Sequence, residues 1–156
     1  MKTITILLLI ITGFWACNPS QKQEPPAMGE REAQHEQHKA AVGPSGLQLN
    51  NGAKWAADAP TNANVKNLQA ILATFGEGTD RSLSAHLNVA EQLQTGLNKM
   101  IKECKMKGAD HDALHQWLEP LLGQVKQLKA ATTETDAAAL LQTILTQVSY
   151  YDQFFE

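Results

Sequence analysis

The chain has 156 residues, of which 19% are charged, and its formal net charge is −3 at pH 7. No segment concentrates the basic side chains that would neutralise phosphates, so the composition argues against nucleic acid as a partner. The chain has only two cysteines, Cys17 and Cys104.

The first sixteen residues have the features of a signal peptide. Lys2 precedes a short apolar stretch, residues 4–11, and Ala16 lies directly before Cys17. The stretch is too short for a membrane-spanning helix, which needs about 20 apolar residues, and it suits the apolar region of a signal peptide. We therefore predict a lipoprotein of the bacterial cell envelope, cleaved before Cys17, lipidated on its thiol and exposed to the periplasm or the cell surface. The alternative is an ordinary secretory signal with a coincidental cysteine.

Residues 17–45 are rich in Gln, Glu, Lys, Pro and Ala. Such a segment has too little apolar surface to offset the entropy of ordering, so we predict a lipidated, flexible tether. His35 and His38 lie three residues apart within it and would share a face of a transient helix. A solvated linker is favoured there over a metal trap.

Residues 46–60 read as an irregular lead-in, and its apolar side chains Leu47, Leu49 and Trp55 are expected to pack on the domain that follows. From Thr61 onward, apolar residues recur at steps of three and four, which is the period of amphipathic helices. The first stripe is Val65, Leu68, Leu72 and Phe75. The second is Leu83, Leu87, Ala90, Gln94, Leu97, Ile101 and Cys104, widened by Leu93 and Met100. The third is His111, Leu114, Leu118, Leu121, Val125 and Leu128, and the fourth is Ala137, Leu141, Ile144, Val148, Tyr151 and Phe155.

Polar residues and glycine predict where these helices begin and end. Thr79 or Asp80 is expected to cap the second helix, and Gly108 to end it. Asp110 is the expected N-cap of the third helix, and Thr133 with Asp136 resembles a capping box for the fourth. Pro120 lies inside the third helix and predicts a kink or a brief break.

Four amphipathic helices joined by short turns predict an all-α fold, an antiparallel up-down-up-down four-helix bundle within residues 46–156. This topology brings the end of the second helix, the start of the third and the aromatic C-terminus to one end of the bundle.

Four potential metal ligands gather at that end: Cys104, Met106, His111 and His115. Residues four apart share one helical face, as two histidine ligands of one ion would. A thiolate, a thioether and two imidazoles favour copper(I), and Cys with His alone would suit zinc. The structural alternative has Cys104 and Met106 as core residues and His111 as a hydrogen-bonded buried histidine. His86 belongs to the opposite end and is excluded.

Catalytic patterns are lacking in the sequence. It contains no haem-attachment C-x-x-C-H, nucleophile elbow or phosphate loop. The one Glu-x-x-His pair, from Glu32 to His35, lies in the tether, whereas a di-iron bundle needs such pairs on two helices. Lipidation of Cys17 would leave Cys104 without a disulfide partner, at the negative end of a helix where a thiolate is disfavoured. We therefore expect a protein that is not an enzyme.

The segment from Cys104 to Leu118 has the outline C-x-M-x-G-x-x-H-x-x-L-H-x-W-L. With Lys54-Trp55 and the aromatic C-terminus, it resembles small helical envelope lipoproteins of Bacteroidota over residues 46–156. The resemblance implies a compartment and a helical fold, and it supplies no catalytic residue.

Two functions follow as hypotheses. In the first, a membrane-anchored periplasmic bundle binds copper or zinc at one end. In the second, a non-catalytic accessory lipoprotein docks another envelope protein through a bundle face or through its aromatic C-terminus.

Overall fold

The computed structural model describes residue 43 and residues 46–156. The predicted signal peptide, the lipidation site at Cys17 and nearly all of the predicted tether lie outside these residues. The described helices are α1 (Ala59–Glu77), α2 (Leu83–Glu103), α3 (Gly108–Lys129), α4 (Glu134–Ser149) and the short α5 (Tyr151–Phe154). Among them, none combines the length and the apolarity that a bilayer crossing requires.

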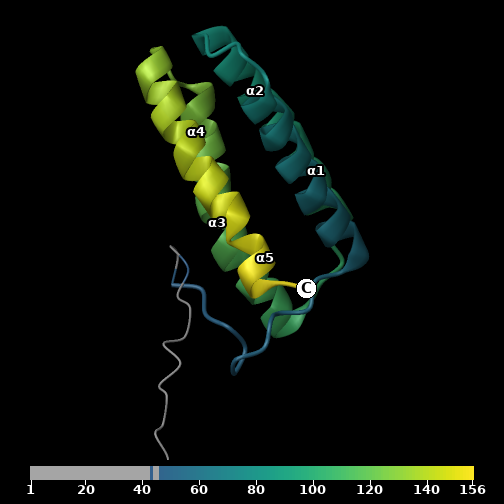
Figure 1. Cartoon of the computed structure of the whole chain (residues 1–156). Coiled ribbons are helices and arrows are strands. Elements are labelled where there is room, and N and C mark those ends of the chain that lie inside the picture. Colours follow the sequence, from purple (N-terminus) through teal and green to yellow (C-terminus); the bar gives the residue numbers. More distant parts are fainter. Residues whose placement is uncertain (1–42, 44–45) are drawn as a thin grey trace, which may run out of the picture. The chain divides into compact units, whose positions relative to one another are not determined.

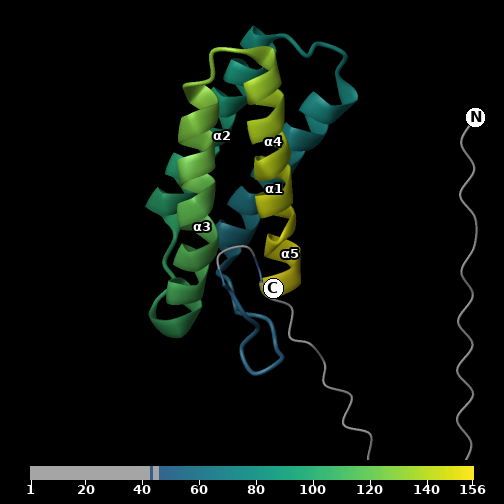
Figure 2. The same cartoon turned by 90° about the vertical axis from the view of Figure 1, so that its left-hand side faces the viewer.

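The four long helices form an antiparallel bundle, which confirms the predicted fold class (Figure 1). Helix α1 packs on α2 and α4, while α3 packs on α2 and α4, and α2 also contacts α4 across the bundle. In the view turned by 90°, the turn between α2 and α3 lies at the same end as α5 and the lead-in (Figure 2). That end is the one at which the sequence places the candidate ligands.

The apolar stripes of α1, α3 and α4 face the core as predicted, but the stripe of α2 is rotated. Its buried side is centred on Leu93, Leu97 and Met100, whereas Ile101 is 50% exposed. The rotation places Gly96 against α1, where a Cβ atom at Gly96 would stand 2.7 Å from Leu68 Cδ2. Because Gly96 has no side chain, α1 can approach α2 more closely at this point than a larger residue would allow.

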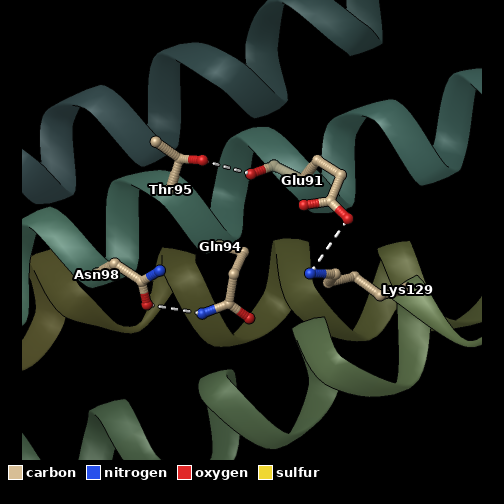
Figure 3. A network of polar contacts seen from close by, with 5 residues as sticks. All are labelled: Glu91, Gln94, Thr95, Asn98 and Lys129. Atoms are coloured by element: carbon tan, nitrogen blue, oxygen red, sulfur yellow. Dashed lines mark hydrogen bonds and ion pairs between the residues drawn. The ribbon is translucent and has the colours of Figure 1, made fainter.

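The outward face of α2 is polar. The Lys129 ammonium, at the end of α3, lies 3.1 Å from the Glu91 carboxylate, and the Gln94 amide donates to Asn98 at 2.9 Å (Figure 3). The hydroxyl of Thr95 donates to the backbone carbonyl of Glu91 at 2.9 Å. These contacts hold the polar side chains of α2 along the solvent-facing surface of the bundle.

The N-terminal caps of α1 and α4 are side-chain caps. Asp58 accepts from the backbone N–H of Thr61 at 2.8 Å, and Thr133 accepts from that of Asp136 at 3.1 Å. The cap predicted for α2 was wrong: Ser82 is its N-cap, and the Asp80 carboxylate accepts from the backbone N–H of Ser82. Asp80 therefore orders the turn before the helix rather than capping the helix itself.

The start of α3 also differs from the prediction. The helix begins at Gly108, with φ of 66°, and its N-cap residue Lys107 makes no side-chain cap bond. Asp110 is not the cap but lies in the first turn, where its carboxylate accepts from the backbone N–H of Ala56 at 3.1 Å. The Asp110 carboxylate thus links α3 to the lead-in, and because α3 begins at Gly108, His111 lies about one turn inside the helix.

Helix α3 continues through Pro120, so the predicted break does not occur. The proline ring deprives the carbonyl of Gln116 of its helical donor. Gln116 is exposed, and water can therefore satisfy that carbonyl.

The lead-in and the C-terminus close the lower end of the bundle in Figure 1 together. The backbone of Trp55 pairs with that of the last residues: its N–H donates to Phe154 at 2.8 Å, and its carbonyl accepts from Glu156 at 3.0 Å. Leu47 is buried, and Leu49 and Trp55 pack against the core, as predicted. Asp58 adds a link to the α2–α3 turn by accepting from the backbone N–H of Lys105 at 2.7 Å.

Candidate metal site

A pocket of about 230 Å³ lies between the end of α2 and the part of α3 from His111 to Leu122. Its lining is mostly apolar, with two imidazoles, one thiol and one carboxylate among the aliphatic side chains. The lining residues are Met100, Ile101, Cys104, His111, Leu114, His115, Leu118, Glu119 and Leu122. Three of the four residues predicted as ligands, Cys104, His111 and His115, thus share one pocket.

The two histidines are in direct contact. Their Nε2 atoms are 3.2 Å apart, and the rings meet edge to face with centroids 4.7 Å apart. The cause is their spacing of four residues within α3, which places both side chains on one face. In this contact the Nε2–H of one ring donates a hydrogen bond to Nε2 of the other.

Glu119 lies one further turn along the same face. Its Oε1 is 3.5 Å from Nδ1 of His115, and the two side chains are 73% and 50% exposed. The two side chains are within ion-pair distance but form no hydrogen bond, so the negative charge of Glu119 acts on His115 only through space. Glu119 was not among the predicted site residues, although its spacing of four residues from His115 was the available signal.

Cys104 is the C-cap residue of α2, and its backbone N–H donates to the carbonyl of Met100 at 2.9 Å. Its thiol is free and half-buried. Met106, the predicted fourth ligand, does not line the pocket and packs against the hydrophobic core instead. Met100, one helical turn before Cys104, is fully buried and lines the pocket. The thioether next to the histidines is thus the one inside α2, not the one in the turn.

The pocket does not hold a preformed set of ligands. Among residues 43 and 46–156, no three His, Cys, Asp or Glu side chains converge closely enough to hold a metal ion as they stand. The two imidazoles contact each other, and Cys104 lines the same pocket.

The aromatic residues expected near the cluster close the end of the bundle and do not line the pocket. Tyr151 stacks on Phe155 with centroids 4.8 Å apart and meets Trp117 edge to face at 5.0 Å. Its hydroxyl donates to Asn62 at 2.9 Å, and burial raises the pKa of Tyr151 well above its usual range. Phe154 and Phe155 are 0% and 2% exposed, so these rings belong to the core and offer no surface to a partner.

His86 is separate from this cluster, as the sequence analysis assumed. It lies in the first turn of α2, is buried against Phe75, and its Nδ1 is 2.9 Å from the carbonyl of Ser82. Its surroundings give it a role in packing.

Comparison with known proteins finds no protein family, no curated protein and no solved structure that the chain matches.

Proposed function

We propose that this protein is a lipid-anchored bundle of the bacterial cell envelope that binds a soft transition metal, Zn(II) or Cu(I), at the α2–α3 pocket. His111 and His115 are the primary ligands, and Cys104 is the third. The observation that carries the proposal is the separation of 3.2 Å between the two Nε2 atoms.

The distance suits a shared ion. A tetrahedral metal with metal–nitrogen bonds of about 2.0–2.1 Å holds two nitrogen ligands about 3.4 Å apart. The observed separation of 3.2 Å is close to this value. The Glu119 carboxylate, 3.5 Å from Nδ1 of His115, adds a negative charge beside the pair.

The donors around the pocket favour soft or borderline metals. Imidazole and thiolate are the usual ligands of zinc, and a thiolate together with a thioether suits copper(I). Cys104 supplies the thiolate, and Met100 rather than Met106 is the thioether that lines the pocket. In the zinc form Met100 remains part of the apolar wall, because zinc sites are built from nitrogen, thiolate and carboxylate ligands.

The metal proposal is tested on the mature chain, residues 17–156 with Cys17→Ser to prevent acylation. Titration with Zn(II), and anaerobically with Cu(I), should show one equivalent bound. The double variant His111→Ala with His115→Ala should lose this binding, and Cys104→Ser should weaken it. A matched control carries His35→Ala with His38→Ala and should bind as the parent does. One bound equivalent that survives loss of both His111 and His115 would overturn the site.

The proposed lipid anchor at Cys17 is tested separately in the full-length chain. Expressed in a bacterial host, it should fractionate with membranes, and its N-terminal peptide should carry acyl chains on Cys17, seen by mass spectrometry. Cys17→Ser should release it from the membrane fraction, because acyl chains supply the membrane affinity. Membrane association that persists in this variant would contradict a lipid anchor.

A further inference from the structure

We propose that a second pocket, at the end of the bundle opposite the histidine pair, binds a small neutral hydroxyl compound with an apolar body, such as an alkylphenol. This pocket lies between the end of α1, the start of α2 and the part of α4 from Ala138 to Leu145. The inference does not depend on the metal proposal, because the two pockets share no lining residue.

The polar anchor of this pocket is the ring of His86, which is 2% exposed and belongs to the lining. Its Nδ1 is 2.9 Å from the carbonyl oxygen of Ser82. A carbonyl can only accept, so Nδ1 carries the proton and Nε2 carries the lone pair. Among the described residues Nε2 has no hydrogen-bond partner, and it is not fully enclosed. A buried acceptor without a partner is costly, and a donor placed in the pocket would remove that cost.

The charges around the pocket exclude a cationic donor. The guanidinium of Arg81 is part of the lining and donates to the carbonyls of Phe75 and Gly76, each at 3.1 Å. The positive end of the α2 dipole adds to this charge. The Asp80 carboxylate accepts from the backbone N–H of Ser82 and does not line the pocket. An ammonium group would therefore meet a like charge.

The lone pair at Nε2 of His86 excludes a carboxylate for a different reason. A carboxylate has no proton to donate, so two acceptors would face each other. A neutral hydroxyl group donates to Nε2 without bringing a charge next to Arg81. The hydroxyl is therefore the head group that fits both polar side chains.

Most of the remaining lining is apolar, and it consists of Leu72, Phe75, Ala138, Leu141 and Leu145. Apolar pockets with a few convergent polar groups are typical of small-molecule sites. Leu145 is 38% exposed and is one of two exposed large hydrophobic side chains in the described part of the chain. An apolar body bound beside His86 would cover it.

The volume sets the size of the ligand. A cavity of about 150 Å³ accommodates benzene, with six carbon atoms. By the same ratio, the pocket of about 290 Å³ has room for roughly twelve non-hydrogen atoms. An alkylphenol such as para-propylphenol, with about ten such atoms, is within this limit.

The test titrates the metal-free mature chain, residues 17–156 with Cys17→Ser, with para-propylphenol, with its methyl ether para-propylanisole and with para-propylbenzoate. Nuclear magnetic resonance follows the shifts of backbone amides in α1, α2 and α4. The net contribution of one hydrogen bond corresponds to about two- to tenfold in affinity. We therefore expect para-propylphenol, the one probe that can donate to Nε2 of His86, to bind at least about threefold more tightly than the ether or the carboxylate does.

Variants separate the anchor from the apolar wall. His86→Phe removes the acceptor and keeps a ring, and the Ser82 carbonyl still accepts from the backbone N–H of residue 86. The affinity for para-propylphenol should fall to that for para-propylanisole. Leu145→Gln, at an exposed position that folding tolerates, should weaken all three probes severalfold. Ile101→Gln changes the other exposed large hydrophobic residue, which lines the α2–α3 pocket, and it should alter none of them.

Equal affinities for para-propylphenol and para-propylanisole, or tighter binding of para-propylbenzoate, would overturn the inference. It would also fail if para-propylphenol did not bind up to its solubility limit. Binding that Ile101→Gln weakens and Leu145→Gln does not would place the ligand in the α2–α3 pocket instead, against the inference. None of these outcomes affects the metal proposal, which is tested by titration with metal alone.

Discussion

At the scale of single residues, the histidine pair is the part of the site that the sequence predicts best. Spacing along one helix is a local property, so His111 and His115 meet wherever α3 forms. Met106, the predicted thioether ligand, does not line the pocket, for a related reason. Met106 lies in the turn between α2 and α3, and whether a turn residue points to the core or to a pocket depends on packing, not on spacing. Met100 lies in a helix, but its position facing the pocket depends on the rotation of α2.

Glu119 offers a test of how a charge beside His115 affects metal binding. Glu119→Gln removes the negative charge that lies 3.5 Å from Nδ1 of His115, and we expect the affinity for Zn(II) to fall by a factor of about two to five, because an exposed ion pair contributes about 0.2–1 kcal/mol. The measurement is a competition titration of zinc in the mature chain. Glu77→Gln, at the end of α1 and at the other end of the bundle, is the control. An unchanged affinity in Glu119→Gln would show that the charge of the carboxylate does not contribute.

At the scale of elements, the sequence predicts which faces of α1, α3 and α4 are buried, because the apolar period records this directly. It predicts the helix ends less well. Asp110 and Asp80 both have side chains that can cap a helix, but neither does so. The Asp110 carboxylate accepts from the backbone N–H of Ala56, and the Asp80 carboxylate accepts from that of Ser82. The partner of Asp110 is 54 residues away in the chain, and no local pattern contains that information. The rotation of α2 escaped prediction similarly, since it depends on the packing of Gly96 against α1.

Two glycines within helices provide a matched pair of stability predictions. Gly96→Ala places a Cβ atom 2.7 Å from Leu68 Cδ2 at the α1–α2 contact, and we expect it to destabilise the bundle by about 1–3 kcal/mol through overpacking. Gly123→Ala, in α3, meets no atom within 4 Å and should stabilise by about 0.5–1 kcal/mol through helix propensity.

Urea unfolding followed by circular dichroism measures both free energies. Opposite signs are the expected result. A stabilising Gly96→Ala would mean that α1 and α2 can move apart without cost, and the close approach of the two helices would then have no energetic consequence.

At the scale of the whole molecule, Asp58 joins the lead-in, α1 and the α2–α3 turn. Partial burial acts to raise the pKa of Asp58, but hydrogen bonds from Thr61 and from the backbone of Lys105 outweigh it, so the pKa is lowered from its ordinary value. A carboxyl with a lowered pKa in the folded state contributes stability above its unfolded pKa, and the contribution is lost as the pH falls through the folded pKa.

Asp58→Asn should therefore be less stable than the parent at neutral pH. The difference in unfolding free energy should stay constant from about pH 7 to pH 5 and shrink below about pH 4, near the ordinary range of aspartate. Thermal unfolding across this pH range measures it. A difference that does not change with pH would show that the charge of Asp58 does not contribute. Asp80→Asn serves as the comparison, since Asp80 also has a lowered pKa but joins no second element.

The fold class is the whole-molecule property that was predictable, because four amphipathic helices with short turns have few other ways to bury their apolar faces. The way in which the lead-in and the C-terminus close one end of the bundle was not predictable. The lead-in has no periodic pattern, and its backbone pairing with the last residues joins parts of the chain that share no local signal.

That pairing also bears on the kinetics of folding. Consecutive long helices pack on one another along the bundle, and contacts that are local in sequence favour folding within microseconds to milliseconds. The bridge between Trp55 and Phe155 joins the lead-in to the C-terminus and, like the packing of α1 on α4, closes a loop that spans most of the described chain. We expect it to form after the transition state. Weakening it should then accelerate unfolding and leave the rate of folding nearly unchanged. The lifetime of the folded bundle would thus depend on the contacts between the lead-in and the C-terminus.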